Sequence, residues 1–226
     1  MLTVSNFTCT VQEKCICTGD YLRITPERLT VLLGTSGGGK TRLLKGVAGL
    51  TDEVRGAVSW QGKTVTEPLY NVVQLGMLFQ NNALLDGLTV EENLQLVAKT
   101  DNESITNGLE HLGLSSCGEM YPGELSEGMK RRVALLRAGL GQPQLILLDE
   151  PLAGLDGTAR EKVLVLVSRW QQAGCCLLLS THILAGLEKL NACYYVIADG
   201  KLQGEYNTLS EVKESQPEQF RESDEI

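Results

Sequence analysis

The sequence predicts an α/β protein with a mainly parallel core sheet, and two observations carry this prediction. Short apolar runs, rich in leucine and β-branched residues, alternate with stretches of helical periodicity, which is typical of parallel strands covered on both faces. The first of these runs leads through a glycine-rich loop into an apolar pattern of helical spacing, so strand, loop and helix follow one another directly. The predicted core strands are LTVLL (29–33), LILLD (145–149), CCLLLS (175–180) and YYVIA (194–198).

Two further segments predict an antiparallel β layer and a helical lobe beside this core. GAVSWQGK (56–63) is short, alternating and bounded by turn residues, so it favours an antiparallel edge strand or hairpin, and residues 2–24 are assigned to the same layer. The stretch 83–142 is mainly helical in pattern, which indicates a helical lobe inserted into the core. We therefore predict a single domain over residues 1–226, with a core at about 1–82 and 143–207, the lobe at about 83–142, and an acidic tail at about 208–226 that begins as a helix and ends loosely.

The composition limits which classes of protein the chain can belong to. Its 226 residues are 42% hydrophobic, enough for a substantial core, and its net charge of −8 argues against a nucleic-acid-binding protein that relies on a basic face. No apolar run approaches the roughly 20 residues that span a bilayer. The N-terminus lacks a basic segment followed by an apolar stretch, so no signal peptide is predicted and the expected location is the cytosol.

The cysteines favour reduced and mostly buried thiols over a disulfide framework, because they are odd in number and scattered along the chain. Cys15 and Cys17 are separated by one residue, but no second pair or histidine matches them, so they do not predict a zinc site. The seven cysteines are Cys9, Cys15, Cys17, Cys117, Cys175, Cys176 and Cys193.

The glycine-rich loop GTSGGGKT (34–41) predicts a phosphate-binding site. It fits the pattern G-x-x-x-x-G-K-[ST] after a strand and before a helix, whereas a plain glycine-rich turn would need neither neighbour. Its glycines let backbone N–H groups approach phosphate oxygens, Lys40 can reach the β- and γ-phosphates, and the hydroxyl of Thr41 can bind Mg²⁺. The predicted ATP-binding residues of the loop are Gly34, Thr35, Ser36, Gly37, Gly38, Gly39, Lys40 and Thr41.

Side chains at the ends of other segments indicate the same phosphate chemistry. Asp149 ends a buried strand, where an acidic residue holds Mg²⁺ in P-loop enzymes, and Glu150 follows it in position to orient or deprotonate a water molecule that attacks the γ-phosphate. Gln80 ends GMLFQ and His182 follows LLLST, so both are expected where strands open onto the phosphate crevice. Taken singly, these residues could equally form an acidic turn, a surface amide and a structural loop histidine.

The stretch LSEGM (125–129) predicts the start of a helix. Ser126 is suited to cap a helix that begins at Glu127, because apolar residues recur at 129, 133, 136 and 140 as a buried stripe. The positive end of that helix dipole would favour a phosphate group.

The order of GTSGGGKT, FQ, LSEGM, LILLDE, AGLD and TH resembles the ATP-binding subunit of an ABC transporter over about residues 2–207. The resemblance implies a P-loop ABC ATPase fold that hydrolyses ATP with Mg²⁺ and no nucleic-acid partner. It implies that Glu150 is the general base, that His182 contacts the γ-phosphate and that Lys40 takes part in catalysis. Gln80 would also sense the membrane subunit. The implied metal-binding residues are Thr41, Gln80 and Asp149.

In the family that the chain resembles, two subunits pack head to tail, and each ATP lies between the P-loop of one chain and the LSGGQ-type signature of the other. The resemblance therefore implies a homodimer. Ser126 and the N–H group of Gly128 would face the γ-phosphate of the ATP on the partner, and Asp156, in AGLD, would lie at the dimer seam.

Several positions depart from the family pattern. Glu127 stands where glycine is usual. Its carboxylate can interact favourably with the helix dipole and pair with Lys130 or Arg131. Alternatively, the carboxylate can oppose closure around ATP. At ~6 Å from the γ-phosphate and an effective dielectric of ~20, each unit of phosphate charge would cost ~3 kcal/mol before screening. Met129 replaces the usual glutamine, and Ile183 follows the histidine where aspartate is frequent. The candidates for an adenine-stacking aromatic are Phe7 and Tyr21, although either could belong to the core.

The runs at 76–94 and 124–132 resemble the ATPases of Mla-type systems, which traffic phospholipids with an Mce-domain protein. This resemblance implies integral-membrane permease subunits, an Mce-domain protein and a small STAS-domain protein as partners, with the chain on the cytoplasmic face of the inner membrane. The alternatives are the ATPase of another ABC system for amino acids or lipoproteins, a soluble non-transport ABC ATPase, and a non-hydrolysing cassette. The compact acidic chain argues against the soluble class, and retention of the P-loop lysine and both acids argues against the non-hydrolysing one.

Overall fold

The computed structural model describes residues 1–97 and 100–216. Ten strands in these residues form one sheet. Their bounds are β1 Leu2–Val11, β2 Lys14–Ile24, β3 Leu29–Gly34, β4 Val54–Trp60, β5 Lys63–Thr64, β6 Leu75–Leu78, β7 Leu145–Asp149, β8 Cys176–Thr181, β9 Ala192–Ala198 and β10 Lys201–Tyr206. Their spatial order is β5-β4-β1-β2-β10-β9-β3-β8-β7-β6, so the sheet mixes parallel and antiparallel neighbours and the predicted fold class is confirmed.

The parallel half of the sheet contains the four strands that the sequence predicts, which are β3, β7, β8 and β9, together with β6, which was not predicted. β3 pairs in parallel with β8 and β9, and β7 pairs in parallel with β8 and β6. Every residue of β3, β7 and β8 is buried, because helices cover both faces and a continuous apolar run can only lie in such a sheet. β7 occupies the predicted range 145–149.

The antiparallel half is continuous with this core. β1 pairs with β2 and β4, and β4 pairs with β5 at the sheet edge, as GAVSWQGK (56–63) predicts. The connection is β10, which is antiparallel to β9 and pairs in parallel with β2 at Lys201 and Thr18. The predicted antiparallel layer is therefore the curled end of the same sheet.

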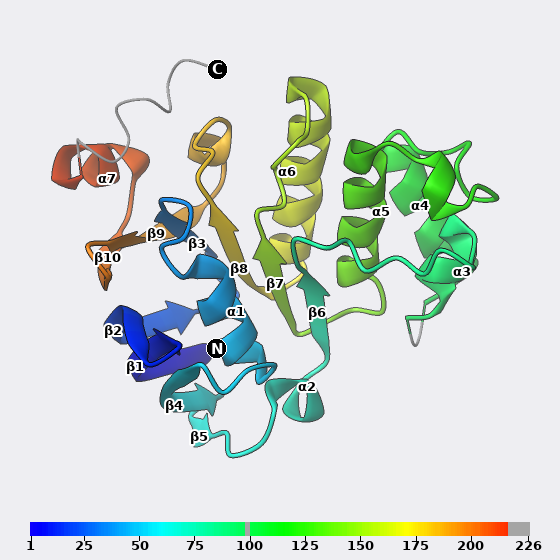
Figure 1. Cartoon of the computed structure of the whole chain (residues 1–226). Coiled ribbons are helices and arrows are strands. Elements are labelled where there is room, and N and C mark those ends of the chain that lie inside the picture. The colour runs from blue at the N-terminus through cyan, green and yellow to red at the C-terminus, as the bar shows by residue number, and fades with distance from the viewer. Residues whose placement is uncertain (98–99, 217–226) are drawn as a thin grey trace.

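The helices surround the sheet at different places in Figure 1. α1 lies against the sheet, α6 lies beside the parallel strands, and α3, α4 and α5 extend to one side, while α7 lies at the opposite end. The bounds are α1 Lys40–Ala48, α2 Leu69–Val72, α3 Val90–Gln95, α4 Asn102–His111, α5 Glu127–Gly139, α6 Gly157–Gln172 and α7 Leu209–Ser215, with 3₁₀ turns at Pro122–Glu124 and Leu187–Lys189.

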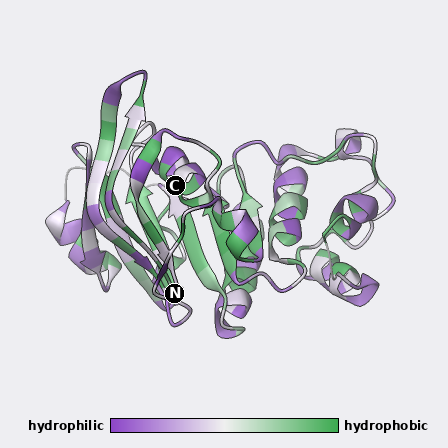
Figure 2. Cartoon of the chain, turned by 90° about the horizontal axis from the view of Figure 1, so that it is seen from below, coloured by the Kyte–Doolittle hydropathy of each residue, from purple (hydrophilic) through white to green (hydrophobic). Residues whose placement is uncertain are grey.

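Two hydrophobic clusters lie on opposite faces of the parallel strands. One joins the strands to α5, α6 and the side lobe. The other joins α1 to both halves of the sheet, so the curled antiparallel strands enclose α1, the helix that follows the glycine-rich loop. Figure 2 shows that the central strands are mainly hydrophobic, whereas the helices carry both hydrophobic and hydrophilic residues. The rigid packing around α1 fixes the loop at its N-terminus.

The lobe is joined to the core through a close contact between α5 and β6. A Cβ atom on Gly76 of β6 would lie 1.8 Å from the backbone oxygen of Ala138 on α5, so only glycine lets the two elements approach this closely. The C-terminal end of α5 therefore packs on the edge of the core sheet.

The remaining predictions concern the tail, the thiols and the membrane. α7 begins the predicted tail as a helix, and residues 217–226 lie outside the described part of the chain. Six cysteines are buried and Cys15 is exposed, so the prediction of mostly buried thiols is confirmed. Over residues 1–97 and 100–216, none of the helices is long and apolar enough to cross a bilayer.

Candidate nucleotide-binding site

The glycine-rich loop connects β3 to α1 as the sequence predicts. Gly37 and Gly39 have φ angles of 82° and 98°, in the left-handed region where glycine is least strained. Gly39 caps α1 without any side-chain hydrogen bond, and no acidic residue occupies the first turn. The positive end of the helix dipole is therefore available to an anion.

Lys40 folds back over this loop. Its Nζ donates to the backbone oxygens of Gly34, at 2.7 Å, and Thr35, at 3.2 Å. Its side chain is only 6% exposed. The ammonium is thus held at the centre of the loop, where phosphate oxygens can replace the carbonyl groups as its partners.

Asp149 and Thr41 meet beside the loop. Oγ1 of Thr41 donates to Oδ2 of Asp149 at 2.7 Å, and Oγ of Ser180 donates to Oδ1 of the same carboxylate at 2.6 Å. Ser180 was not predicted as a site residue. It lies opposite Asp149 because β7 and β8 pair in parallel in that register.

The donor set here fits Mg²⁺. One carboxylate and one hydroxyl supply hard oxygen atoms, and Mg²⁺ prefers to keep waters and phosphate oxygens as its other ligands. A dedicated protein cage is not needed, and the part of the chain that the structure describes holds no cluster of three or more acidic, histidine or cysteine ligands. Thr41 and Asp149 are the residues that would hold the ion.

Glu150 lies between Lys40 and His182. Its Oε1 is 3.2 Å from Nζ of Lys40, and its Oε2 accepts the backbone N–H of His182 at 3.3 Å and lies 3.0 Å from Nδ1 of the same residue. The φ angle of Glu150 is 51°, which is strained for a non-glycine residue, and its backbone N–H donates to the carbonyl of Ser180 at 3.0 Å. The structure thus brings the three predicted catalytic side chains together.

Glu150 and His182 line a cavity of about 380 Å³. Gln80 is exposed and lines the same cavity, so it shares one space with Ser36 of the P-loop and with these two side chains. The start of α5 lies on another wall. The lining includes Ser36, Gln80, Glu127, Gly128, Glu150 and His182.

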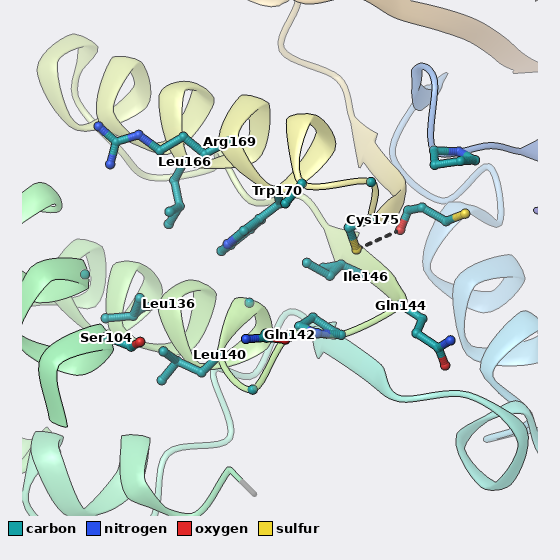
Figure 3. Close-up of a pocket in the computed structure, with 18 of the residues that line it drawn as sticks. Ser104, Leu136, Leu140, Gln142, Gln144, Ile146, Leu166, Arg169, Trp170 and Cys175 are labelled. Carbon is teal, nitrogen blue, oxygen red and sulfur yellow. Dashed lines mark hydrogen bonds between the residues drawn. The ribbon is translucent and has the colours of Figure 1, made fainter. Parts of the chain in front are cut away.

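A larger cavity lies elsewhere. It measures about 730 Å³ and is drawn in Figure 3, where Leu136 of α5 and Leu140, just after that helix, lie opposite Leu166 and Trp170 of α6. Gln144 and Cys175, just before β7 and β8, also line it, so it opens at the opposite ends of the parallel strands from Asp149. Its size alone does not make it the nucleotide site.

Ser126 caps α5, as the sequence predicts. Its Oγ accepts the N–H of Met129 at 3.3 Å, and its side chain is exposed. A Cβ atom on Gly128 would lie 3.5 Å from the backbone oxygen of Gly154, which is ordinary contact, so the packing of this chain leaves room for a side chain there. Asp156 caps α6 in the same manner and is also exposed.

Glu127 pairs with Lys130 and not with Arg131. Nζ of Lys130 lies 2.8 Å from Oε1 of Glu127, whose side chain is 81% exposed. Arg131 is buried and points inward, away from this pair. Of the two pairings that helix spacing allows, the structure contains the first.

Phe7 is not available to stack on a base in this structure. Its side chain is 1% exposed and lies so close to Gly19 that a Cβ there would be 2.4 Å from the ring. Tyr21 is 46% exposed. Burial therefore assigns Phe7 to the core and leaves Tyr21 as the accessible aromatic of the two.

Comparison with known proteins decides the family. The family described as ABC transporter matches residues 18–153, more than half of the chain. This chain belongs to the ABC transporter family. The ABC ATPase is 39% identical to the aliphatic sulfonates import ATP-binding protein SsuB of Bacillus subtilis, over 71% of this chain and 64% of that protein. It is 38% identical to the taurine import ATP-binding protein TauB of Pelagibacter ubique, over 80% of this chain and 71% of that protein.

A solved structure agrees with this family. An ATP-binding subunit of an ABC transporter superposes on the ABC ATPase with a TM-score of 0.80 at 26% identity, covering 97% of this chain and 94% of that one. The sequence prediction of an ABC ATPase is confirmed. The named relatives are import ATP-binding proteins, so they do not support the Mla-type assignment.

Proposed function

We propose that this ABC ATPase is the motor subunit of a membrane transporter and works as a homodimer on the cytoplasmic face of the membrane. One observation supports this most strongly. The P-loop, Asp149 and Glu150 are assembled at the carboxyl ends of the parallel strands. The capping residues Ser126 and Asp156 are exposed, so the helix ends that they cap are accessible to a second copy. Each cap accepts one N–H group of its own helix, and the end of α5 stays exposed, so its remaining N–H groups are suited to a phosphate on another chain.

Hydrolysis then follows from the charges at the site. The phosphates of ATP attract Lys40 from the carbonyls of Gly34 and Thr35 and from Glu150. The freed carboxylate of Glu150 accepts a proton as water attacks the γ-phosphorus and the bond to the bridging oxygen of ADP breaks. Mg²⁺, when bound by Thr41 and Asp149, neutralises part of the phosphate charge. Loss of the γ-phosphate removes the link between the two copies, so they separate.

A groove beside β6 is the proposed contact with the permease. β6 is the edge strand of the sheet, and a cavity of about 200 Å³ lies between it and the C-terminal half of α5. Leu85 and Leu96, in the neighbouring segments, are more than half exposed. A permease helix in this groove would contact β6, the strand that leads to Gln80, and so could move the nucleotide-sensing residue.

Two cargo classes have support from specific observations. SsuB and TauB are named for the import of small sulfonates, which favours an importer of small solutes. The runs 76–94 and 124–132 resemble Mla-type ATPases, which favours phospholipid trafficking with Mce-domain and STAS-domain partners. We place the importer first, because the similarity to the import ATPases extends over most of the chain.

Co-expression of this chain with a candidate permease tests the proposal. We expect the two to purify together in detergent and the complex to hydrolyse ATP faster than the isolated subunit. The vesicle-reconstituted complex would then be offered a labelled sulfonate or a labelled phospholipid, which separates the two cargo classes. Purified protein that binds no ATP would contradict the proposal, and so would a nucleotide-trapped dimer with Ser126 far from every triphosphate.

A further inference from the structure

Arg131 is a buried cation that joins three segments of the ABC ATPase. It lies on α5 and is only 7% exposed. One guanidinium nitrogen donates to the carbonyl of Phe79 at 2.7 Å and also contacts the carbonyl of Gln80 at 3.4 Å. The other donates to the carbonyl of Asp149 and, at 2.7 Å, to that of Glu150.

Burial of the charged guanidinium of Arg131 costs free energy, because the charge is removed from water. Burial lowers the pKa of the guanidinium, and the negative charges of Asp149 and Glu150 oppose that shift. No ion pair compensates the charge within the described residues, so carbonyl dipoles hold it in place. A forked donor such as guanidinium can hold two carbonyl groups at once, which a lysine ammonium cannot do with the same geometry.

The position of Arg131 along α5 links it to the helix cap. It follows Ser126 by five residues, or about 7.5 Å along a helix that rises 1.5 Å per residue. A shift of the α5 tip therefore moves the guanidinium, and with it the carbonyls of Gln80 and Glu150. Glu150 has a strained backbone, so a displacement there changes the direction of its carboxylate.

We infer that Arg131 is a positioning residue that sets the place of Glu150 and Gln80 according to the position of α5. The inference rests on the proposed dimer, in which Ser126 of α5 touches the ATP of the partner. Occupation of one nucleotide site would then align the general base of the other, because the same helix serves both. Arg131 would make the two hydrolysis sites cooperative.

The chain offers a matched control in Arg137. This residue also lies on α5, its pKa is lowered by burial, and it donates to the carbonyls of Asn82 and Ala83. Its contacts stop short of Asp149 and Glu150. Replacing Arg137 therefore removes a partly buried guanidinium from the same helix without releasing the predicted general base.

The experiment compares full-length Arg131→Met, Arg131→Lys and Arg137→Met dimers with the wild type. We expect Arg131→Met to lower kcat on the order of 10²-fold, as small misplacements of catalytic groups do, while the Kd for ATP stays within about twofold. The Hill coefficient for ATP hydrolysis should fall from above 1 to 1. Arg131→Lys should recover part of kcat, and Arg137→Met should keep both kcat and the Hill coefficient.

Each outcome is decisive for Arg131. Equal losses in Arg131→Met and Arg137→Met, or an unchanged Hill coefficient in Arg131→Met, would overturn the inference and leave both residues with a structural role. Thermal unfolding and ATP binding are measured for each variant to identify a folding failure. If Arg131→Met does not fold, Arg131→Lys is compared with the wild type in its place. An inactive wild type, or one that remains monomeric with ATP, would instead count against the proposed function.

Discussion

Nζ of Lys40 lies 3.2 Å from Oε1 of Glu150, so the cation of the P-loop is paired with the proposed general base. Both side chains are largely buried, which makes each the main compensation for the charge of the other. The pair therefore represents a resting arrangement of the site. ATP competes with Glu150 for Lys40, and the base becomes free only when phosphate is present.

Replacing Glu150 with glutamine separates binding from hydrolysis. The amide cannot accept a proton, so we expect hydrolysis to fall by about 10²-fold to 10⁴-fold, the range for loss of a general base. ATP binding should persist or strengthen, because the carboxylate that competes with phosphate for Lys40 has been removed. Single-turnover hydrolysis and equilibrium ATP binding measure the two effects.

The matched control for this change is Glu161→Gln. Glu161 forms an exposed pair with Lys189 on the surface and lies away from the P-loop, so this substitution should alter neither quantity. Retained hydrolysis in Glu150→Gln would reject the role of Glu150 as the base. Lost ATP binding would show instead that the pair with Lys40 maintains the fold of the loop.

The contact between Gly76 and α5 predicts a loss of stability. Gly76→Ala places a methyl group on the backbone oxygen of Ala138, and neither β6 nor α5 can yield without shifting the sheet edge or the lobe. We expect the free energy of unfolding to fall by about 1–3 kcal/mol or more, as overpacked cores do. Gly87→Ala is the control, since no atom lies within 4 Å of its added methyl group. Equal denaturation midpoints for the two variants would contradict the packing argument.

The elements that the sequence predicts correctly have local physical causes. LILLD (145–149) becomes β7 because a continuous apolar run must be covered on both faces, and Ser126 caps α5 because its hydroxyl competes for the first free N–H groups. The curled order of the strands has no such cause. It depends on pairings such as that of Lys201 with Thr18, which lie far apart in the sequence and leave no local pattern.

The residues of the candidate site were likewise predictable only where a local sequence pattern indicates them. The P-loop, Asp149 and Glu150 were predicted because phosphate and Mg²⁺ chemistry favours those residue types in that local context, and the other motif residues came from the family resemblance, whereas two supporting residues were missed. Ser180 is the last letter of an apolar strand, and only the register of β7 and β8 places it on Asp149. Arg131 belongs to a basic run that indicates an exposed helix face, and contacts with segments some 20 to 50 positions away bury it.

Alkylation tests the burial of the thiols. Burial raises the pKa of Cys175 to about 12, so this thiol stays neutral and unreactive at pH 8. Cys15 is the exposed cysteine, and we expect iodoacetamide to label it alone in the native ABC ATPase, with all seven labelled after denaturation. Intact-mass analysis counts the adducts, and Cys15→Ser should remove the native adduct. Rapid native labelling at several further cysteines would show that the strands open more readily than their packing implies.

The ion pair between Glu127 and Lys130 leads to a prediction about how charge at the N-terminus of α5 affects closure around ATP. The pair brings a carboxylate to the wall of the nucleotide cavity, and Lys130 neutralises it at 2.8 Å. Lys130→Met would leave that carboxylate uncompensated near a phosphate. We expect the ATP-bound dimer to weaken by about tenfold, a fraction of the unscreened repulsion between such charges. Glu127→Gly removes the repulsion and should favour the dimer instead.

The double variant Glu127→Gln/Lys130→Met decides whether charge is the cause. It removes both charges while keeping a side chain of good helix propensity, so dimer formation should return to the wild-type level or above. Sedimentation of each variant in a Glu150→Gln background, where ATP is not consumed, measures the dimer fraction directly. If Glu127→Gly and Lys130→Met both leave that fraction unchanged, the Glu127 carboxylate turns to solvent when the dimer closes, and its pair with Lys130 serves the helix alone.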